Sequence, residues 1–178
     1  MSKVKVAWGA KVPRAFLMRV REIAEELEIE PSWLMACMAF ETGERFSASV
    51  RNPQSSATGL IQFMEATARG MGTTTAKLAA MSELEQLEWV RRYFLPWRGR
   101  LRSLADVYMV ILWPAAVGKP DDFVLFARRD SRRRRAYLVN AGLDADRDGD
   151  VDKSEAAAKV AAKLRKGLGV GYVLEVDA

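Results

Sequence analysis

Apolar residues recur at helical spacing along most of this chain, and the pattern predicts a mostly α-helical protein. After Pro13, six apolar positions fall on one side of a helix, with charged residues between them. These positions are Phe16, Leu17, Val20, Ile23, Ala24 and Leu27. Residues 31–41 are instead apolar nearly all round, which is typical of a helix buried in a core, and Gly43 follows as a stop signal.

Further helices are predicted along the rest of the chain. Ser82 and Glu85 form a capping box at the start of a helix that stops before Pro96. Other helices are expected to end near Met71 and to span about residues 77–81, 104–113, 120–129 and 154–167. Residues 172–176 alternate only weakly in polarity, so they predict either a short strand or no regular structure.

The composition limits the chemistry that this chain can perform. Its 178 residues fit one domain, and the only cysteine, Cys37, lies in an apolar run and cannot form an internal disulfide. Because the chain has no histidine, Ser-His-Asp and Cys-His catalysis are excluded, and acid–base chemistry must come from carboxylates, lysine or tyrosine. The net charge of +5 favours an anionic partner, whether a cell-wall polymer, lipid headgroups or nucleic acid.

Glu41 is a carboxylate in the last turn of the apolar helix. Burial favours the neutral form of a carboxyl group, so the pKa of Glu41 is expected to rise. A raised pKa is what a general acid needs near neutral pH, for example to protonate the leaving oxygen of a glycosidic bond. The alternative from position alone is that Glu41 points into solvent at a helix end.

The residues around Glu41 resemble a known family. In chain order the motif residues are Glu41, Thr42, Gly43, Phe46, the run Ala-Thr-Gly-Leu-Ile-Gln-Phe-Met at 57–64, and Thr67 with Ala68. This order resembles the lytic transglycosylases and their goose-type lysozyme relatives, over roughly residues 31–115. The closest resemblance is to the single-domain versions that bacteriophages carry.

The resemblance implies an all-α, lysozyme-like single domain over residues 1–178, with its catalytic part at about 13–115. It implies that Glu41 acts as the catalytic acid and then as the base, with no cofactor for catalysis. Gln62 would lie in the glycan cleft and bond an N-acetyl group, Gly59 would let the backbone approach the substrate, and Tyr108 would lie near the catalytic carboxylate.

Several positions depart from the family pattern. Thr42 stands where Ser is usual, Ile61 where Met is usual, and Glu65 where Pro is common. Tyr108 is not followed by the family's Asn-Ala-Gly. This departure leaves open whether Tyr108 faces the site or is a core residue on an apolar helix face.

The activity that the resemblance implies is cleavage of peptidoglycan between N-acetylmuramic acid and N-acetylglucosamine. No second acid with a comparable motif accompanies Glu41. Glu44, Glu65 and Asp106 are candidates, each of which fits a solvated surface charge as well. A single acid favours the lytic transglycosylase mechanism, with a hydrolytic lysozyme that uses the same Glu as the alternative. The alternative of another class is a non-catalytic wall-binding or virion structural protein.

A second candidate site lies near the C-terminus. The acidic residues of 144–155 fit the twelve-residue EF-hand calcium loop, with Gly149 at the sharp turn. The predicted ligands are Asp144, Asp146, Asp148, Asp150 through its backbone carbonyl, Asp152 through water, and Glu155. The loop is expected to bind a structural Ca²⁺ that holds the last helix in place. The alternative is a solvated acidic turn without an ion.

The charged segments predict partners and location. Six arginines within residues 128–135 indicate either a solvated basic face or contact with an anionic cell-envelope surface. Nucleic acid is not the expected partner, because no recognition motif accompanies these arginines. The chain is expected to act as a monomer on peptidoglycan glycan strands.

Residues 1–11 lack the apolar core of a signal peptide, and no apolar run in the sequence reaches membrane-spanning length. The expectation is a protein made in a host cytoplasm. It would reach the wall after holin release, as a bacteriophage endolysin, or be carried in the virion.

Overall fold

The structure is a computed structural model that describes residues 3–177, and it is mostly α-helical. The structure is about 52% helical, with eight α-helices among the described residues, and the strands described form only two-stranded sheets. The mostly-α class predicted from the sequence is therefore confirmed. The described residues divide into two compact units, residues 3–99 with 163–177, and residues 100–162. The single domain predicted for the whole chain stays a prediction.

The first unit is built around α2 (Pro31–Glu41), whose residues 34–39 are all buried. These residues include Cys37, which is buried, as its place in an apolar run indicates. Helix α1 (Arg14–Leu27) packs on α2 and on α5 (Glu83–Phe94), and it buries all six apolar positions of its predicted face. The all-round apolar helix thus forms the centre of this unit, and Glu41 is its last residue.

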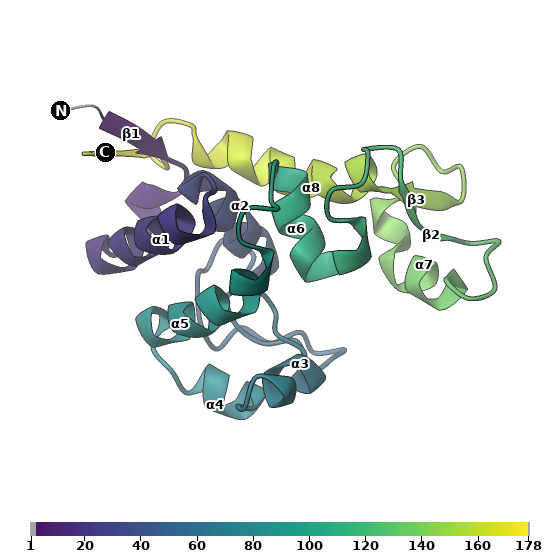
Figure 1. Cartoon of the computed structure of the whole chain (residues 1–178), viewed down its shortest axis with the longest axis horizontal. Helices are drawn as coiled ribbons and strands as arrows, with labels where there is room; N and C mark the ends of the chain where they lie inside the picture. The colour runs from purple at the N-terminus through teal and green to yellow at the C-terminus, as the bar shows by residue number, and fades with distance from the viewer. Residues whose placement is uncertain (1–2, 178) are drawn as a thin grey trace. The chain divides into compact units, whose positions relative to one another are not determined.

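Short elements complete the first unit (Figure 1). A 3₁₀ turn at Gly9–Lys11 precedes α1, and α3 (Glu65–Gly70) and α4 (Thr75–Ala79) precede α5. Strand β1 (Lys3–Val6) pairs with β4 (Leu174–Asp177) in antiparallel register, with Val4 opposite Val176. The weak alternation near the C-terminus is therefore a strand, because β1 supplies its partner.

The second unit contains α6 (Leu104–Leu112), strands β2 (Val124–Ala127) and β3 (Asp150–Asp152), α7 (Arg134–Asn140) and the first part of α8 (Lys153–Gly167). The two strands pair in antiparallel register, with Ala127 opposite Asp150. The helix predicted over residues 120–129 is wrong. Residues 121–122 form a turn, and the apolar run after it becomes β2 because β3 lies beside it.

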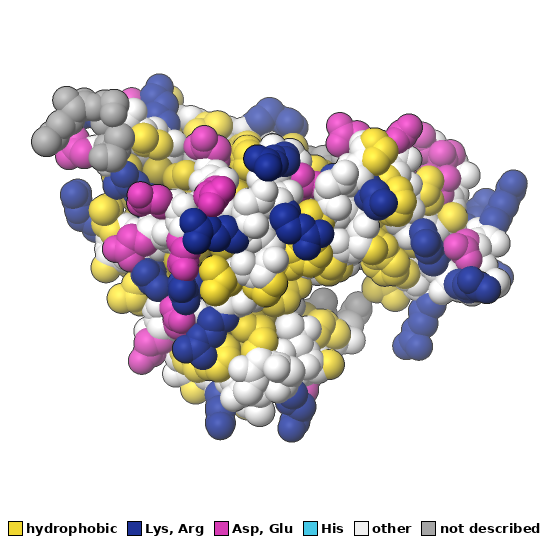
Figure 2. All heavy atoms as spheres, in the orientation of Figure 1, with side chains coloured by type: hydrophobic (Ala, Val, Ile, Leu, Met, Phe, Trp, Pro, Cys, Tyr) yellow, Lys and Arg dark blue, Asp and Glu magenta, His cyan; other side chains and the backbone are white. Residues whose placement is uncertain are grey.

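Among the described residues, no helix combines the length and the apolar character that crossing a bilayer requires. Figure 2 shows Lys and Arg side chains scattered over the face drawn, with Asp and Glu side chains among them. Charges of both signs therefore share this face.

A buried ion pair fixes the start of α8 within the second unit. The Nζ atom of Lys153 donates to the Oδ1 atom of Asp106 at 2.6 Å and to the carbonyl of Lys119 at 2.7 Å. Asp106 also accepts the backbone N–H groups of Gly118 and Arg102. Burial opposes its ionisation, but these hydrogen bonds outweigh burial and lower the pKa of Asp106.

Asp106→Asn is expected to destabilise the protein by about 3–5 kcal/mol, because it leaves the Lys153 ammonium buried without its counter-ion. Urea unfolding measures this loss. The exposed Asp122→Asn in the same unit is the matched control and should change stability by less than about 0.5 kcal/mol. Equal stability of the two variants would show that the ion pair contributes nothing.

Candidate active site and acidic loop

The turn after α2 holds Glu41 at a fixed helix end. Thr42 is fully buried, and its hydroxyl donates to the carbonyl of Met38 at 2.7 Å and accepts the backbone N–H of Phe46 at 2.9 Å. Gly43, Glu44 and Phe46 all have positive φ angles, which gives a tight reversal of the chain. The turn uses a hydroxyl at position 42, so Thr serves where the resembled family has Ser.

The Glu41 carboxyl group is half-buried at this helix end. Burial raises its pKa to about 7 from an ordinary value of 4.5. Its charge also acts on two neighbours, Cys37 one turn earlier and Tyr93 on α5, whose pKa values are raised first by burial and then by the charge of Glu41. Glu41 is therefore protonated for a large part of the time near neutral pH, as a general acid must be.

Tyr93 is a neighbour of Glu41 for which the sequence predicted no role in the site. Its ring meets that of Phe63 edge-on, with centroids 5.9 Å apart. Phe63 follows Gln62 directly, so Tyr93 links the Glu41 helix end to the predicted glycan-binding segment. The sequence signals were its place on the α5 face that carries Val90 and Phe94, both of which are buried, and the resemblance of this helix to the one that packs beneath the site in the family.

The buried side chain of Gln86 holds the segment from Gly59 to Gln62 in place. Its Oε1 atom accepts the N–H of Leu60 at 2.7 Å. Its Nε2 atom donates to the carbonyls of Ala48 at 3.1 Å and Leu78 at 2.8 Å. One side chain thus ties three separate chain segments together.

Gly59 is required by this contact. Its φ angle is +83°, and a Cβ atom built on it would lie 2.3 Å from the Oε1 atom of Gln86. Any other residue would displace Gln86 and strain the backbone. The resemblance implied that Gly59 lets the backbone approach the substrate. The contact with Gln86 is a separate, structural reason for a glycine at this position.

The half-buried Gln62 has a φ angle of 55° and uses its amide nitrogen to hold its own loop. The Nε2 atom donates to the carbonyls of Val50 at 3.2 Å and Gly59 at 3.0 Å. Because both partners are acceptors, the NH₂ end must face them and Oε1 must point elsewhere. Oε1 has no hydrogen-bond partner among the described residues, so Gln62 offers a ligand an acceptor for an N–H group.

The other predicted residue, Tyr108, belongs to the second unit. It lies on α6 and is 3% exposed. Its predicted contact with substrate stays a prediction.

The three candidates for a second acid all have hydrogen-bond or ion-pair partners within the protein. Glu44 pairs with Lys163 and, at 2.6 Å, with Lys166, and these hydrogen bonds lower its pKa. Glu65 accepts the hydroxyl and N–H of Thr75, which lower its pKa. Asp106 is in the buried ion pair described above. Low pKa values keep these carboxylates ionised, so Glu41 differs from all three.

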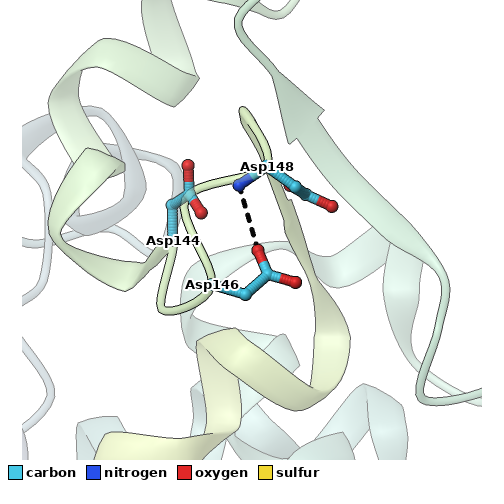
Figure 3. Close-up of side chains that lie close together, drawn as sticks. All are labelled: Asp144, Asp146 and Asp148. Carbon is cyan, nitrogen blue, oxygen red and sulfur yellow. Dashed lines mark hydrogen bonds between the residues drawn. The ribbon is translucent and has the colours of Figure 1, made fainter.

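The acidic residues near the C-terminus form a cluster before α8 (Figure 3). One carboxylate oxygen from each of Asp144, Asp146 and Asp148 lies within 4.8 Å of the others, so the cluster can hold a metal ion. The Oδ1 atom of Asp146 accepts the N–H of Asp148 at 3.1 Å. Gly149 has a φ angle of +97°, which makes the sharp turn expected at this position.

The other predicted ligands fold back on the same loop. Glu155 accepts the backbone N–H of Ala145 at 2.9 Å, and Asp152 accepts the N–H of Glu155 at 2.8 Å. Asp150 lies in β3, and burial together with the surrounding negative charges raises its pKa. The loop therefore gathers negative charge that its own hydrogen bonds do not neutralise.

One oxygen atom of the loop fits a cation directly. The Oδ2 atom of Asp144 accepts the Tyr137 hydroxyl at 2.7 Å and the N–H of Gly149 at 3.2 Å. Its Oδ1 atom is buried and has no hydrogen-bond partner among the described residues. A buried carboxylate oxygen without a donor is costly unless a cation binds it.

Gln86→Ala is expected to lower the free energy of unfolding by about 3 kcal/mol or more, because three buried backbone groups lose their partner. Urea unfolding monitored by tryptophan fluorescence measures the change. Gln54→Ala, at an exposed loop position, is the control and should be neutral. A Gln86→Ala protein as stable as the control would rule out this side chain as the link between the three segments.

Comparison with protein-family models and with curated proteins finds no match to this chain. The family resemblance accordingly rests on the motif residues and stays a prediction.

Proposed function

We propose that this protein is a lysozyme-like enzyme that cleaves peptidoglycan between N-acetylmuramic acid and N-acetylglucosamine, with Glu41 as the catalytic acid. The observation that carries the proposal is the half-buried Glu41 carboxyl, whose pKa burial raises to about 7 at a tightly turned helix end. The order of motif residues after it supports the same activity. The monomeric chain would act on glycan strands.

The mechanism needs one acid. Protonated Glu41 gives its proton to the glycosidic oxygen while the bond from that oxygen to C1 of N-acetylmuramic acid breaks, which releases the N-acetylglucosamine hydroxyl. The Glu41 carboxylate then takes the proton of the 6-hydroxyl as this oxygen bonds to C1. The product carries a 1,6-anhydro ring, Glu41 is protonated again, and no water is consumed.

The engaged state of the other candidate acids supports this single-acid mechanism over hydrolysis. A two-carboxylate glycosidase needs a second group that can activate water or attack C1. Glu44 and Glu65 already accept short hydrogen bonds from cations or from a threonine. Moving either carboxylate to a sugar would break those contacts.

The site residues have separate roles in this proposal. The Oε1 atom of Gln62 accepts the N–H of a substrate acetamido group. Tyr93 shields one side of Glu41 from water and so helps to keep its pKa high.

The acidic loop is proposed to bind a structural Ca²⁺ in the manner of an EF-hand. The ion would be held by Asp144, Asp146, Asp148, the backbone carbonyl of Asp150, Asp152 through water, and Glu155. When bound, Ca²⁺ supplies positive charge that neutralises these carboxylates. The buried, unpartnered Oδ1 atom of Asp144 supports the assignment.

The biological role that the family resemblance supports is that of a bacteriophage lysin, either an endolysin released by a holin or a virion-associated enzyme. Dye-labelled, purified peptidoglycan tests the enzymatic proposal. We expect the wild-type protein to release soluble fragments and Glu41→Gln to release none. Binding to peptidoglycan without release, by both proteins, would indicate a non-catalytic wall-binding protein instead.

A further inference from the structure

Helix α7 exposes a face that combines basic and apolar side chains. Arg134, Arg135, Leu138 and Val139 follow helical spacing that places all four on one side. The two apolar side chains are unusually exposed, Leu138 at 59% and Val139 at 77%. Tyr137, on the opposite side, is buried and bonded to Asp144. This outward face is called the α7 face below.

The arginines of the α7 face are available to a partner. The side chains of Arg134 and Arg135 have no hydrogen bond or ion pair within the described part of the chain, and both residues are exposed. Arg129 and Arg132, in the turn before α7, are exposed in the same way, whereas Arg133 bonds the carbonyl of Leu125 and anchors the turn. Figure 2 shows Lys and Arg side chains projecting from the region that holds α7.

The α7 face combines two adjacent apolar side chains with unpaired arginine side chains. This combination fits an anionic lipid surface better than it fits a nucleic acid or a wall polymer. Moving leucine and valine side chains from water to the boundary between headgroups and acyl chains lowers the free energy. Arginine side chains are long enough to lie along such apolar groups while their guanidinium groups bond phosphates. A nucleic acid or a wall polymer would satisfy the arginines and leave Leu138 and Val139 in water.

We propose that the α7 face binds the surface of an anionic phospholipid bilayer. The arginines contact the lipid phosphates, and Leu138 and Val139 enter the apolar boundary beneath them. The binding is peripheral and reversible, because α7 is short and only two apolar side chains take part. The proposal rests on α7 alone and does not depend on the assignment of Glu41.

Sedimentation with unilamellar vesicles tests this proposal on the full chain. We expect binding to phosphatidylcholine vesicles that contain about 30% phosphatidylglycerol and little binding to pure phosphatidylcholine, because anionic lipid attracts basic residues. Arg134→Gln with Arg135→Gln should weaken binding about 30-fold, since each arginine near such a surface contributes about a factor of five. Leu138→Ser with Val139→Ser, at unchanged charge, should weaken binding about 10-fold.

The matched control removes the same charge elsewhere. Arg14→Gln with Lys77→Gln alters two exposed positions that are not part of the α7 face. It should change binding less than about threefold, because salt screens the attraction of charges that do not touch the lipid. Circular dichroism should give all variants the wild-type melting temperature. Each should also release fragments from lipid-free peptidoglycan like the wild type, so failure of the lipid proposal is separate from failure of the enzymatic one.

Three results would overturn the proposal. The first is equal binding, or none, to anionic and neutral vesicles. The second is an Arg134→Gln, Arg135→Gln protein that binds like the charge control. The third is a Leu138→Ser, Val139→Ser protein that binds vesicles like the wild type, together with displacement of the variant and the wild type from vesicles by short duplex DNA. That result would make the α7 face a general polyanion site.

Discussion

Replacing Glu41 with Gln is expected to lower the rate of fragment release from peptidoglycan by about 1,000-fold or more. A general acid contributes about two to four orders of magnitude to a reaction rate. The other candidate acids, Glu44, Glu65 and Asp106, have lowered pKa values and cannot replace Glu41 as a proton donor near neutral pH. Glu30→Gln is the matched control. It makes the same substitution at the exposed position before the other end of α2 and should leave the rate within about twofold of the wild type. A Glu41→Gln enzyme as active as this control would end the assignment.

The pH dependence follows from the same carboxyl group. Only protonated Glu41 can start the reaction, so the wild-type rate should fall above about pH 7, where burial places the pKa of Glu41. Measuring the rate of fragment release between pH 5 and pH 9 tests this expected decrease. A rate that stays constant above pH 7 would mean that another group gives the proton.

Stability should change in a defined direction with pH as well. The pKa of Glu41 in the folded protein, about 7, lies above its ordinary value of 4.5, so the folded state holds the proton more tightly. The wild type therefore loses stability as pH rises from about 4.5 to about 7, by at most about 3 kcal/mol, because each pKa unit corresponds to about 1.4 kcal/mol and the partial exposure of the group lowers this value. Glu41→Gln lacks this loss and should be the more stable protein at pH 8 in urea unfolding.

Calcium is expected to raise the melting temperature of the protein by about 5–10 °C when its concentration exceeds the dissociation constant about 100-fold. Binding at that ratio adds about 2.7 kcal/mol to the folded state, and each kcal/mol shifts a chain of this size by about 2–4 °C. Differential scanning fluorimetry with and without chelator measures the shift. Magnesium should raise the melting temperature less than calcium, because Mg²⁺ prefers an octahedral site and keeps several of its bound waters.

Asp144→Asn should abolish most of the calcium shift. The amide keeps one oxygen that can accept the Tyr137 hydroxyl, but it cannot supply the charged oxygen that is buried without a partner. Asp121→Asn, which removes an exposed carboxylate of the same unit outside the loop, should keep the shift. No calcium shift in the wild type and no heat of binding in calorimetry would make residues 144–155 an acidic turn without an ion.

Local patterns predicted the elements that carry their own signals. The apolar residues of α2 identified a core helix and placed Glu41 at its end. The capping box of Ser82 and Glu85 is present as predicted, with the N–H of Glu85 donating to the Ser82 hydroxyl at 3.2 Å. These signals lie within one or two helical turns, where side-chain chemistry acts directly on the backbone.

Contacts between distant parts of the chain could not be predicted in this way. The run at 124–127 is apolar without period, and only its pairing with residues 150–152 makes it a strand. Gln86 looks like an ordinary polar residue of an amphipathic helix, although its partners lie up to 38 positions away. Tyr93 is tied to Glu41 only through the packing of α5 in the first unit.

The central claim is that Glu41, acting as a single acid, breaks the glycan strand of peptidoglycan. Mass spectrometry of the fragments released from purified peptidoglycan tests it most directly, with Glu41→Gln as the control. We predict muropeptides with 1,6-anhydro ends, one water lighter than the reducing form, from the wild type and none from the variant. Fragments with reducing N-acetylmuramic acid ends would contradict the single-acid mechanism, and the absence of fragments from both proteins would contradict the enzymatic function.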